Sequence, residues 1–259
     1  MTRSCHPAQM RLPTRSATSH RVGTIALLLA FLLLLPSFAT AAAAAETPQS
    51  KRPRIGLVLS GGGARGTAHI GVLKVLEELR IPVDVIAGTS MGAIVGGIYA
   101  AGSSPAELEA MVTSIEWNQA FLDRPPLEDL SFRRKEDSAN QMIKFDAGIR
   151  DGKLALPLGL IQGQNLNFIL KSRLIHTYSI NDFDRLGIPF RAVAADIETG
   201  EAVVLGKGDL SNAMRASMSI PGVFAPVEID GRLLVDGGIA DNLPVDVAKK
   251  LGADILIAV

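Results

Sequence analysis

Gly88-Thr89-Ser90-Met91-Gly92 places a serine between two glycines at the point where a strand gives way to a helix. The residues before it, Val83–Ala87, are mostly apolar and β-branched, and Ala93–Ala101 is a small-residue helical segment that Gly102 ends. A serine in such a turn adopts strained backbone geometry and presents its hydroxyl at a helix N-terminus. The stretch therefore predicts a nucleophile, although a tight turn with a helix-capping serine has the same pattern.

An earlier segment has the same strand, glycine loop and helix order. Ile55–Leu59 is an apolar run typical of a buried strand, and the loop Ser60–Gly66 leads into a helix that Pro82 stops. We expect the apolar face of that helix to comprise Val72, Val75, Leu76 and Leu79. Two successive strand and helix units predict an α/β fold with a parallel sheet and right-handed crossovers.

The remaining chain alternates between further expected elements. A capping box from Ser104 to Glu107 starts a helix, and the charged stretch Phe121–Ser138 predicts a surface loop. The alternation of apolar and polar residues around Asp151-Gly152 predicts a hairpin, and we expect the sheet to depart from the parallel pattern there. The other expected elements are a helix through Leu166, Ile169, Leu170 and Leu174, strands at Ile188–Ala195, Ala202–Leu205, Arg232–Val235 and Ala253–Val259, and helices at Ser211–Ser217 and Val245–Leu251.

The first 45 residues have the layout of a secretory signal peptide. Four arginines precede the apolar run Ile25–Leu35, and small residues suitable for cleavage follow at Ala41–Ala45. Eleven apolar residues fall short of the ~20 that a membrane-spanning helix needs. We therefore expect a signal peptide at 1–45, a linker at 46–54 and one domain at 55–259, exported to the periplasm, the outer membrane or the medium.

Composition excludes several classes of function. The whole chain has 26 Lys and Arg against 26 Asp and Glu, and removal of the leader leaves a slightly acidic domain that is a poor partner for nucleic acid. The single cysteine, Cys5, leaves with the leader, so no thiolate remains, and no histidine cluster could hold a metal. Because the chain stops on the bare apolar strand Ala253–Val259, we also expect it to be a fragment of a longer protein.

A serine nucleophile needs a base, and the residues leave this choice open. For both His69 and His176, the sequence favours an ordinary packed or surface histidine over a catalytic base. Asp196 and Asp236 both follow apolar strands, and spacing does not choose between them. The glycine loop could bind an oxyanion or, in a Rossmann domain, a pyrophosphate, but Asp84 stands at the wrong end of its strand to bind a ribose.

Three segments together resemble the patatin-like phospholipases in content, order and spacing, and they are Gly61–Gly66, Gly88–Gly92 and Asp236–Gly238. The resemblance runs from about Arg54 to the chain end. The resemblance implies a three-layer α/β/α fold with a mostly parallel central sheet, and a dyad of Ser90 as nucleophile and Asp236 as base. It also implies an oxyanion hole and supporting motif glycines, with no metal and no cofactor. The implied oxyanion-hole residues are Gly61, Gly62, Gly63 and Arg65, and the supporting glycines are Gly66, Gly88, Gly92, Gly237 and Gly238.

The implied function is hydrolysis of phospholipids or other lipid esters at a membrane surface. Ser131–Lys135 and Leu158–Asn165 are similar to the bacterial exported subgroup, in which the phospholipase passenger precedes a POTRA-type domain and an outer-membrane barrel that this chain lacks. The alternatives are a non-catalytic lipid-binding passenger and a Rossmann-type dinucleotide-binding protein.

Overall fold

The computed structural model describes residues 52–121 and 161–259, together with 123, 131–133, 136, 148–150, 153–155 and 159 between them. The expected signal peptide, residues 46–51 of the expected linker and most of the expected loop Phe121–Ser138 lie outside the described residues. The described part of the chain from Arg52 onward forms one compact unit.

A seven-stranded sheet forms the centre of this unit. Its strands, given so that hydrogen-bonded neighbours follow one another, are β7 (Val227–Ile229), β8 (Arg232–Asp236), β5 (Phe190–Asp196), β2 (Val85–Thr89), β1 (Ile55–Leu59) and β9 (Ile255–Ala258), with β6 (Ala202–Leu205) also bonded to β5. β9, β1, β2 and β5 run parallel, while β8 pairs antiparallel with both β5 and β7, and β6 pairs antiparallel with β5. Of the strands in this sheet, β6 and β8 alone run against the others, so the mostly parallel sheet is confirmed.

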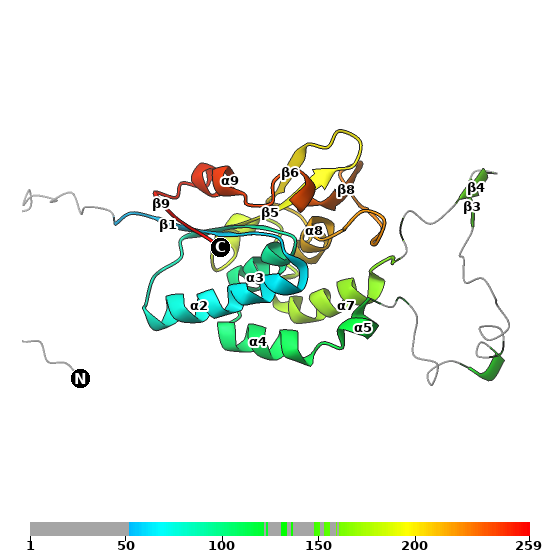
Figure 1. Ribbon diagram of the computed structural model, residues 1–259, viewed down its shortest axis with the longest axis horizontal. Coiled ribbons are helices and arrows are strands. Elements are labelled where there is room, and N and C mark those ends of the chain that lie inside the picture. The colour runs from blue at the N-terminus through cyan, green and yellow to red at the C-terminus, as the bar shows by residue number, and fades with distance from the viewer. Residues whose placement is uncertain are drawn as a thin grey trace, which may run out of the picture. The chain divides into compact units, whose positions relative to one another are not determined.

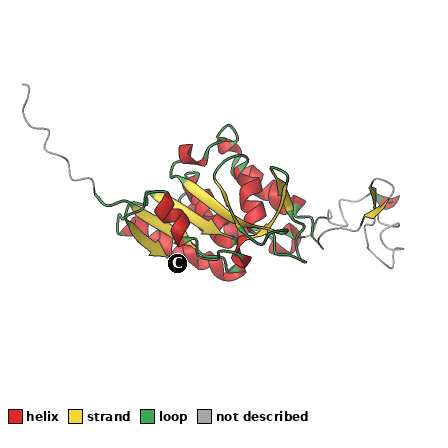
Figure 2. Ribbon diagram, turned by 90° about the horizontal axis from the view of Figure 1, so that it is seen from above, coloured by secondary structure: helices red, strands yellow, loops and turns green. Residues whose placement is uncertain are grey.

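Helices cover both faces of the sheet and complete three layers (Figure 1). Alternate residues of β1 show this division, because Leu57 and Leu59 belong to the large core and Val58 packs with Val247 and Ala248 of α9. Viewed from above, the strands cross the layer of larger helices (Figure 2). That layer contains α2 (Ala68–Glu78), α3 (Met91–Ala100), α4 (Pro105–Ser114), α7 (Gln164–Arg173) and α8 (Leu210–Ser217), while α9 (Val245–Lys250) covers the other face.

Shorter helices join these elements. They are α5 (Trp117–Ala120) and the 3-10 turns η2 (Gly63–Thr67), η4 (Ile175–Thr177), η5 (Phe183–Arg185) and η6 (Gly237–Ile239). The expected capping box is present at the start of α4, where Ser104 and Glu107 bond each other's backbone amides. None of the helices in the described part of the chain has both the length and the apolar character needed to cross a bilayer.

The pairing around β5 brings two strand ends together. β6 pairs with both Val193 and Ala194 along one side of β5. On the other side, Val193 is paired with Thr89, the last residue of β2, and Ala194 is paired with Asp236, the last residue of β8. Because β2 and β8 run in opposite directions, they meet end to end, and the residues that follow or end them lie close together.

The buried face of α2 differs from the sequence prediction. Leu76 is buried as expected, but Val75 is 50% exposed and Leu79 is 64% exposed. The residues that pack inward with Leu76 are His69, Ile70 and Leu73. The helix carries apolar residues over a wide arc, and the face that is buried in the structure contains Ile70, Leu73 and Leu76 together with His69.

The expected hairpin is present but belongs to a different sheet. β3 (Gly148–Arg150) and β4 (Lys153–Ala155) pair antiparallel and form a separate two-stranded sheet. The departure of the central sheet from the parallel pattern therefore comes from β6 and β8, and the expectation that the hairpin causes it was wrong.

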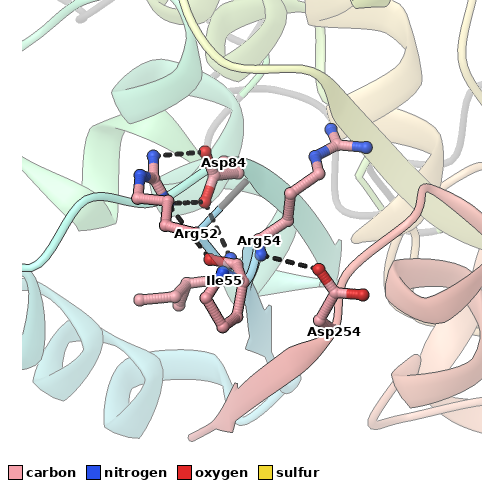
Figure 3. Close-up of polar contacts among 6 residues, drawn as sticks. Arg52, Arg54, Ile55, Asp84 and Asp254 are labelled. Carbon is pink, nitrogen blue, oxygen red and sulfur yellow. Dashed lines mark hydrogen bonds and ion pairs between the residues drawn. The ribbon is translucent and has the colours of Figure 1, made fainter. Parts of the chain in front are cut away.

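Arg52 and Arg54, at the end of the expected linker, are hydrogen-bonded to the domain (Figure 3). Arg52 donates two hydrogen bonds to the carboxylate of Asp84, each 2.7 Å long, and the backbone N–H of Ile55 donates to the same carboxylate at 2.7 Å. The backbone N–H of Arg54 donates to Asp254 at 2.8 Å. The hydrogen bond from Arg52 is the main cause that holds the pKa of Asp84 below its ordinary value.

Candidate active site

Ser90 sits on a strained elbow between β2 and α3. Its backbone adopts φ 54° and ψ −121°, a left-handed φ that is uncommon for a residue with a side chain. The flanking glycines allow this turn because the backbone packs closely around it. A Cβ on Gly88 would lie 2.5 Å from the carbonyl oxygen of Gly92, and a Cβ on Gly92 would lie 2.2 Å from that of Leu59.

The meeting of β2 and β8 brings Ser90 and Asp236 into direct contact. Ser90 Oγ donates a hydrogen bond to Asp236 Oδ2 at 2.6 Å, and each residue is 7% exposed. The other carboxylate oxygen, Oδ1, accepts the backbone N–H of Gly238 at 2.7 Å. Gly237 has no room for a side chain, since a Cβ there would lie 2.1 Å from the carbonyl oxygen of Val193. The carboxylate is thus oriented toward the serine hydroxyl.

The glycine-rich loop lies beside this pair. A Cβ on Gly61 would lie 3.0 Å from that of Ser90, which shows how closely the loop approaches the serine. The N–H of Gly61 donates to the carbonyl of Asn242 at 3.3 Å, and the N–H of Arg65 donates to that of Gly62 at 3.1 Å. Both of these amides are therefore engaged within the protein.

The next two amides of the loop differ from those of Gly61 and Arg65. Gly62 and Gly63 are exposed, and their N–H groups donate to no other group among the described residues. Gly63 adopts φ 54°, and no atom lies within 4 Å of where its Cβ would be. Gly66, by contrast, is buried against Met91, where a Cβ would lie 2.6 Å from the methionine side chain. Gly66 therefore packs η2 against α3, while the amides of Gly62 and Gly63 remain accessible. The Arg65 side chain is exposed.

The structure distinguishes the two aspartates that sequence spacing left equivalent. Asp196 is also 7% exposed, but its Oδ1 accepts the backbone N–H groups of Glu198 at 2.9 Å and Thr199 at 3.4 Å. It closes the turn between β5 and β6, which is an ordinary structural role for aspartate. Asp236 is the aspartate that contacts the serine.

Neither histidine bonds the serine. His69 is buried, with Nε2 2.8 Å from the carbonyl oxygen of Ser60, and His176 is exposed, with Nε2 3.0 Å from that of Ala101. Asp84, which a dinucleotide site would require, is engaged by Arg52 and Ile55 at the opposite end of β2. Among the described residues, no group of three or more His, Cys, Asp and Glu is arranged to hold a metal.

Three contacts to the site carried no sequence signal. Ser217, at the end of α8, accepts the N–H of Ser90, and the carbonyl of Ser219 accepts the N–H of Asp236. The side-chain oxygen of Asn242 lies against Gly61, 2.6 Å from where its Cβ would be. Serines at and just beyond the end of a short helix, like an asparagine in a loop, have many ordinary roles, so the sequence alone did not link these residues to the site.

Comparison with known proteins adds family evidence to this geometry. The family model for the patatin-like phospholipases matches residues 57–249. An uncharacterised NTE family protein of Mycobacterium tuberculosis is 37% identical over 219 residues, which cover 85% of this chain and 52% of that protein. Human patatin-like phospholipase domain-containing protein 6 is 34% identical over 211 residues, which cover 79% of this chain and 13% of that protein.

The chain therefore spans about half the length of the mycobacterial relative and a small part of the human one. Among solved structures, VipD from Legionella pneumophila aligns over 74% of this chain and 47% of its own, with 17% sequence identity and a TM-score of 0.47.

Proposed function

Because the chain belongs to the patatin-like phospholipase family, we propose that it is a serine acyl hydrolase acting on phospholipids or other lipid esters. The observation that carries this proposal is the 2.6 Å hydrogen bond from Ser90 Oγ to Asp236 Oδ2 on a strained elbow. A hydroxyl held by a carboxylate in this way has its proton acceptor in place before substrate arrives.

In the first half of the reaction, Ser90 Oγ attacks the ester carbonyl carbon while Asp236 takes the hydroxyl proton. The resulting tetrahedral intermediate collapses by breaking the bond between the acyl carbon and the alcohol oxygen. Asp236 returns the proton to that oxygen, so the alcohol or lysolipid leaves with a hydroxyl group in place of an alkoxide, and the acyl group stays on Ser90.

In the second half, water attacks the acyl carbon and Asp236 takes one of its protons. Collapse of this second intermediate breaks the bond to Ser90 Oγ, which regains its proton from Asp236. The products are a fatty acid and the original enzyme, so no redox partner is needed.

The negative oxygen of each intermediate requires hydrogen-bond donors. We assign this role to the N–H groups of Gly62 and Gly63, because they lie exposed in the loop beside Ser90 while those of Gly61 and Arg65 donate within the protein. Of the four residues implied by the family resemblance, Gly61 and Arg65 would then shape the loop. Their backbone amides would not contact the oxyanion.

The test compares two aspartates in purified protein. Asp236→Asn removes the proton acceptor, and we expect hydrolysis of a chromogenic acyl ester to fall by about 10⁴-fold or to background, as for loss of a catalytic base. Asp196→Asn is the matched control, because the residue type, strand-end position and 7% exposure are the same. It should keep activity within about twofold.

Ser90→Ala should abolish hydrolysis altogether, and lipid-product mass spectrometry on phospholipid vesicles should show free fatty acid and lysolipid from wild type alone. If Ser90→Ala or Asp236→Asn hydrolyses esters as fast as wild type, the dyad is wrong. If wild type binds vesicles and releases no fatty acid, the non-catalytic lipid-binding alternative is the correct one.

A further inference from the structure

The segment at the end of α8 contacts both members of the Ser90 and Asp236 pair. The backbone N–H of Ser90 donates to Ser217 Oγ at 2.8 Å, and the backbone N–H of Asp236 donates to the carbonyl of Ser219 at 2.8 Å. Ser90 and Asp236 lie 146 positions apart in the chain, and the backbone N–H of each is therefore hydrogen-bonded to the same short segment.

The hydroxyl of Ser217 has a fixed orientation. It is fully buried and donates to the carbonyl oxygen of Val193 at 2.5 Å, which leaves its lone pairs free to accept from Ser90. Val193 is the β5 residue paired with Thr89, the neighbour of Ser90. The hydroxyl thus connects the elbow to the strand that also positions Asp236.

Loss of this hydroxyl would leave a buried amide without a partner. Ser90 already holds a left-handed φ of 54°, a conformation that persists only when surrounding contacts enforce it. An unsatisfied buried N–H favours relaxation of the turn toward any new acceptor. Such a relaxation would move Ser90 Oγ relative to Asp236 Oδ2.

The segment itself is anchored by a buried cation. Arg215 is 3% exposed, donates to Ser219 Oγ and to the carbonyl of Gln162, and lies 4.9 Å from the centre of the Phe224 ring. Burial lowers the pKa of the Arg215 guanidinium. These contacts tie the end of α8 to the chain around Gln162 and Phe224.

We propose that Ser217 is a positioning residue that holds the Ser90 amide and thereby aligns the nucleophile with Asp236. This inference rests on the proposed hydrolase function. It assigns to Ser217 no contact with the substrate, so its removal should slow acylation and leave substrate binding nearly unchanged.

The experiment compares Ser217→Ala with Ser211→Ala in the full chain. Ser211 lies on the same helix, is 3% exposed and bonds Asp209 by its hydroxyl, so its loss removes a similar contact away from the site. We expect Ser217→Ala to lower kcat and the rate of Ser90 labelling by an alkyl fluorophosphonate by about 10- to 100-fold at similar KM, since a misplacement of about 1 Å can cost that much. Ser211→Ala should stay within about twofold of wild type.

Amide hydrogen exchange provides a measurement that does not depend on activity. Exchange at Ser90 should be faster in Ser217→Ala than in wild type and unchanged in Ser211→Ala. If Ser217→Ala does not fold, Ser217→Cys keeps nearly the same volume with a weaker acceptor and should show the same losses to a smaller degree.

Equal labelling rates in folded Ser217 and Ser211 variants would overturn the positioning role, as would unchanged exchange at Ser90. Failure of the underlying function has a different signature, because wild type itself would then neither hydrolyse esters nor be labelled at Ser90.

Discussion

Gly92→Ala tests whether the elbow depends on close backbone contact. The added Cβ would lie 2.2 Å from the carbonyl oxygen of Leu59 and 2.7 Å from that of Ser60, whereas real Cβ atoms essentially never lie closer than 3.0 Å to such a neighbour. Both neighbours are backbone atoms in the layer beside the site, so the start of α3 must move away from β1. Overpacking of this kind costs about 1–3 kcal/mol.

Two other helical glycines serve as controls for Gly92→Ala. Gly71 on α2 has no atom within 4 Å of its Cβ position, so Gly71→Ala should stabilise the protein by about 0.5–1 kcal/mol through helix propensity. At Gly97 the obstacle is Met214 Sδ at 2.6 Å, a flexible side chain that can move, so Gly97→Ala should fall between the other two.

Urea unfolding of the three variants measures these differences in the free energy of unfolding. In thermal unfolding, each kcal/mol should shift Tm by about 2–4 °C. Gly92→Ala should also slow ester hydrolysis, because the displaced helix start carries Ser90 with it. A Gly92→Ala protein within about 0.5 kcal/mol of wild type would refute the close-contact argument, as would a loss of stability in Gly71→Ala equal to that in Gly92→Ala.

Asp84→Asn should lower Tm by about 2–4 °C at pH 7. Because the pKa of Asp84 is depressed in the folded protein, its stabilisation is complete above the unfolded value of about 4 and is lost as pH falls through the lower folded value, so the Tm difference should be constant from pH 7 to about 5 and shrink below 4. A difference that grows on acidification would contradict this. Ser104→Ala should cost about 1 kcal/mol in urea unfolding through loss of the α4 cap, whereas Ser104→Gly should cost only a few tenths, and equal losses would argue against the capping contribution. Export with cleavage predicts that intact-mass measurement of the exported protein finds an N-terminus between Ala42 and Glu46, while a protein that keeps Met1 would rule cleavage out.

The parallel half of the sheet could be predicted because each strand and its following helix are adjacent in the chain. β1 has the expected bounds, as does the antiparallel β6, and Gly102 ends α3 as expected, with φ 108°. Local signals suffice there, since apolar runs, glycine loops and caps each act within a few residues. β7 was missed because it has three residues and only one alternation to reveal it.

The site was predictable in its motifs and unpredictable in its contacts. Sequence spacing could not choose between Asp196 and Asp236, since both end apolar strands. That choice depends on which strand ends beside Ala194 of β5, and strand pairing over long separations leaves no local trace. The Ser217 contact is hidden for the same reason, because its acceptor role requires α8 to pack beneath the elbow.

The end-to-end meeting of β2 and β8 also sets when the site can exist during synthesis. Asp236 follows Ser90 by 146 positions, and since ribosomes add about 5–20 residues per second, roughly 7–30 s pass between the synthesis of the two residues. A nascent chain can form the early strand and helix units in that time, but its serine has no proton acceptor until β8 emerges and docks beside β5. On the proposed chemistry, an incomplete chain cannot cleave the lipids of the cell that is making it.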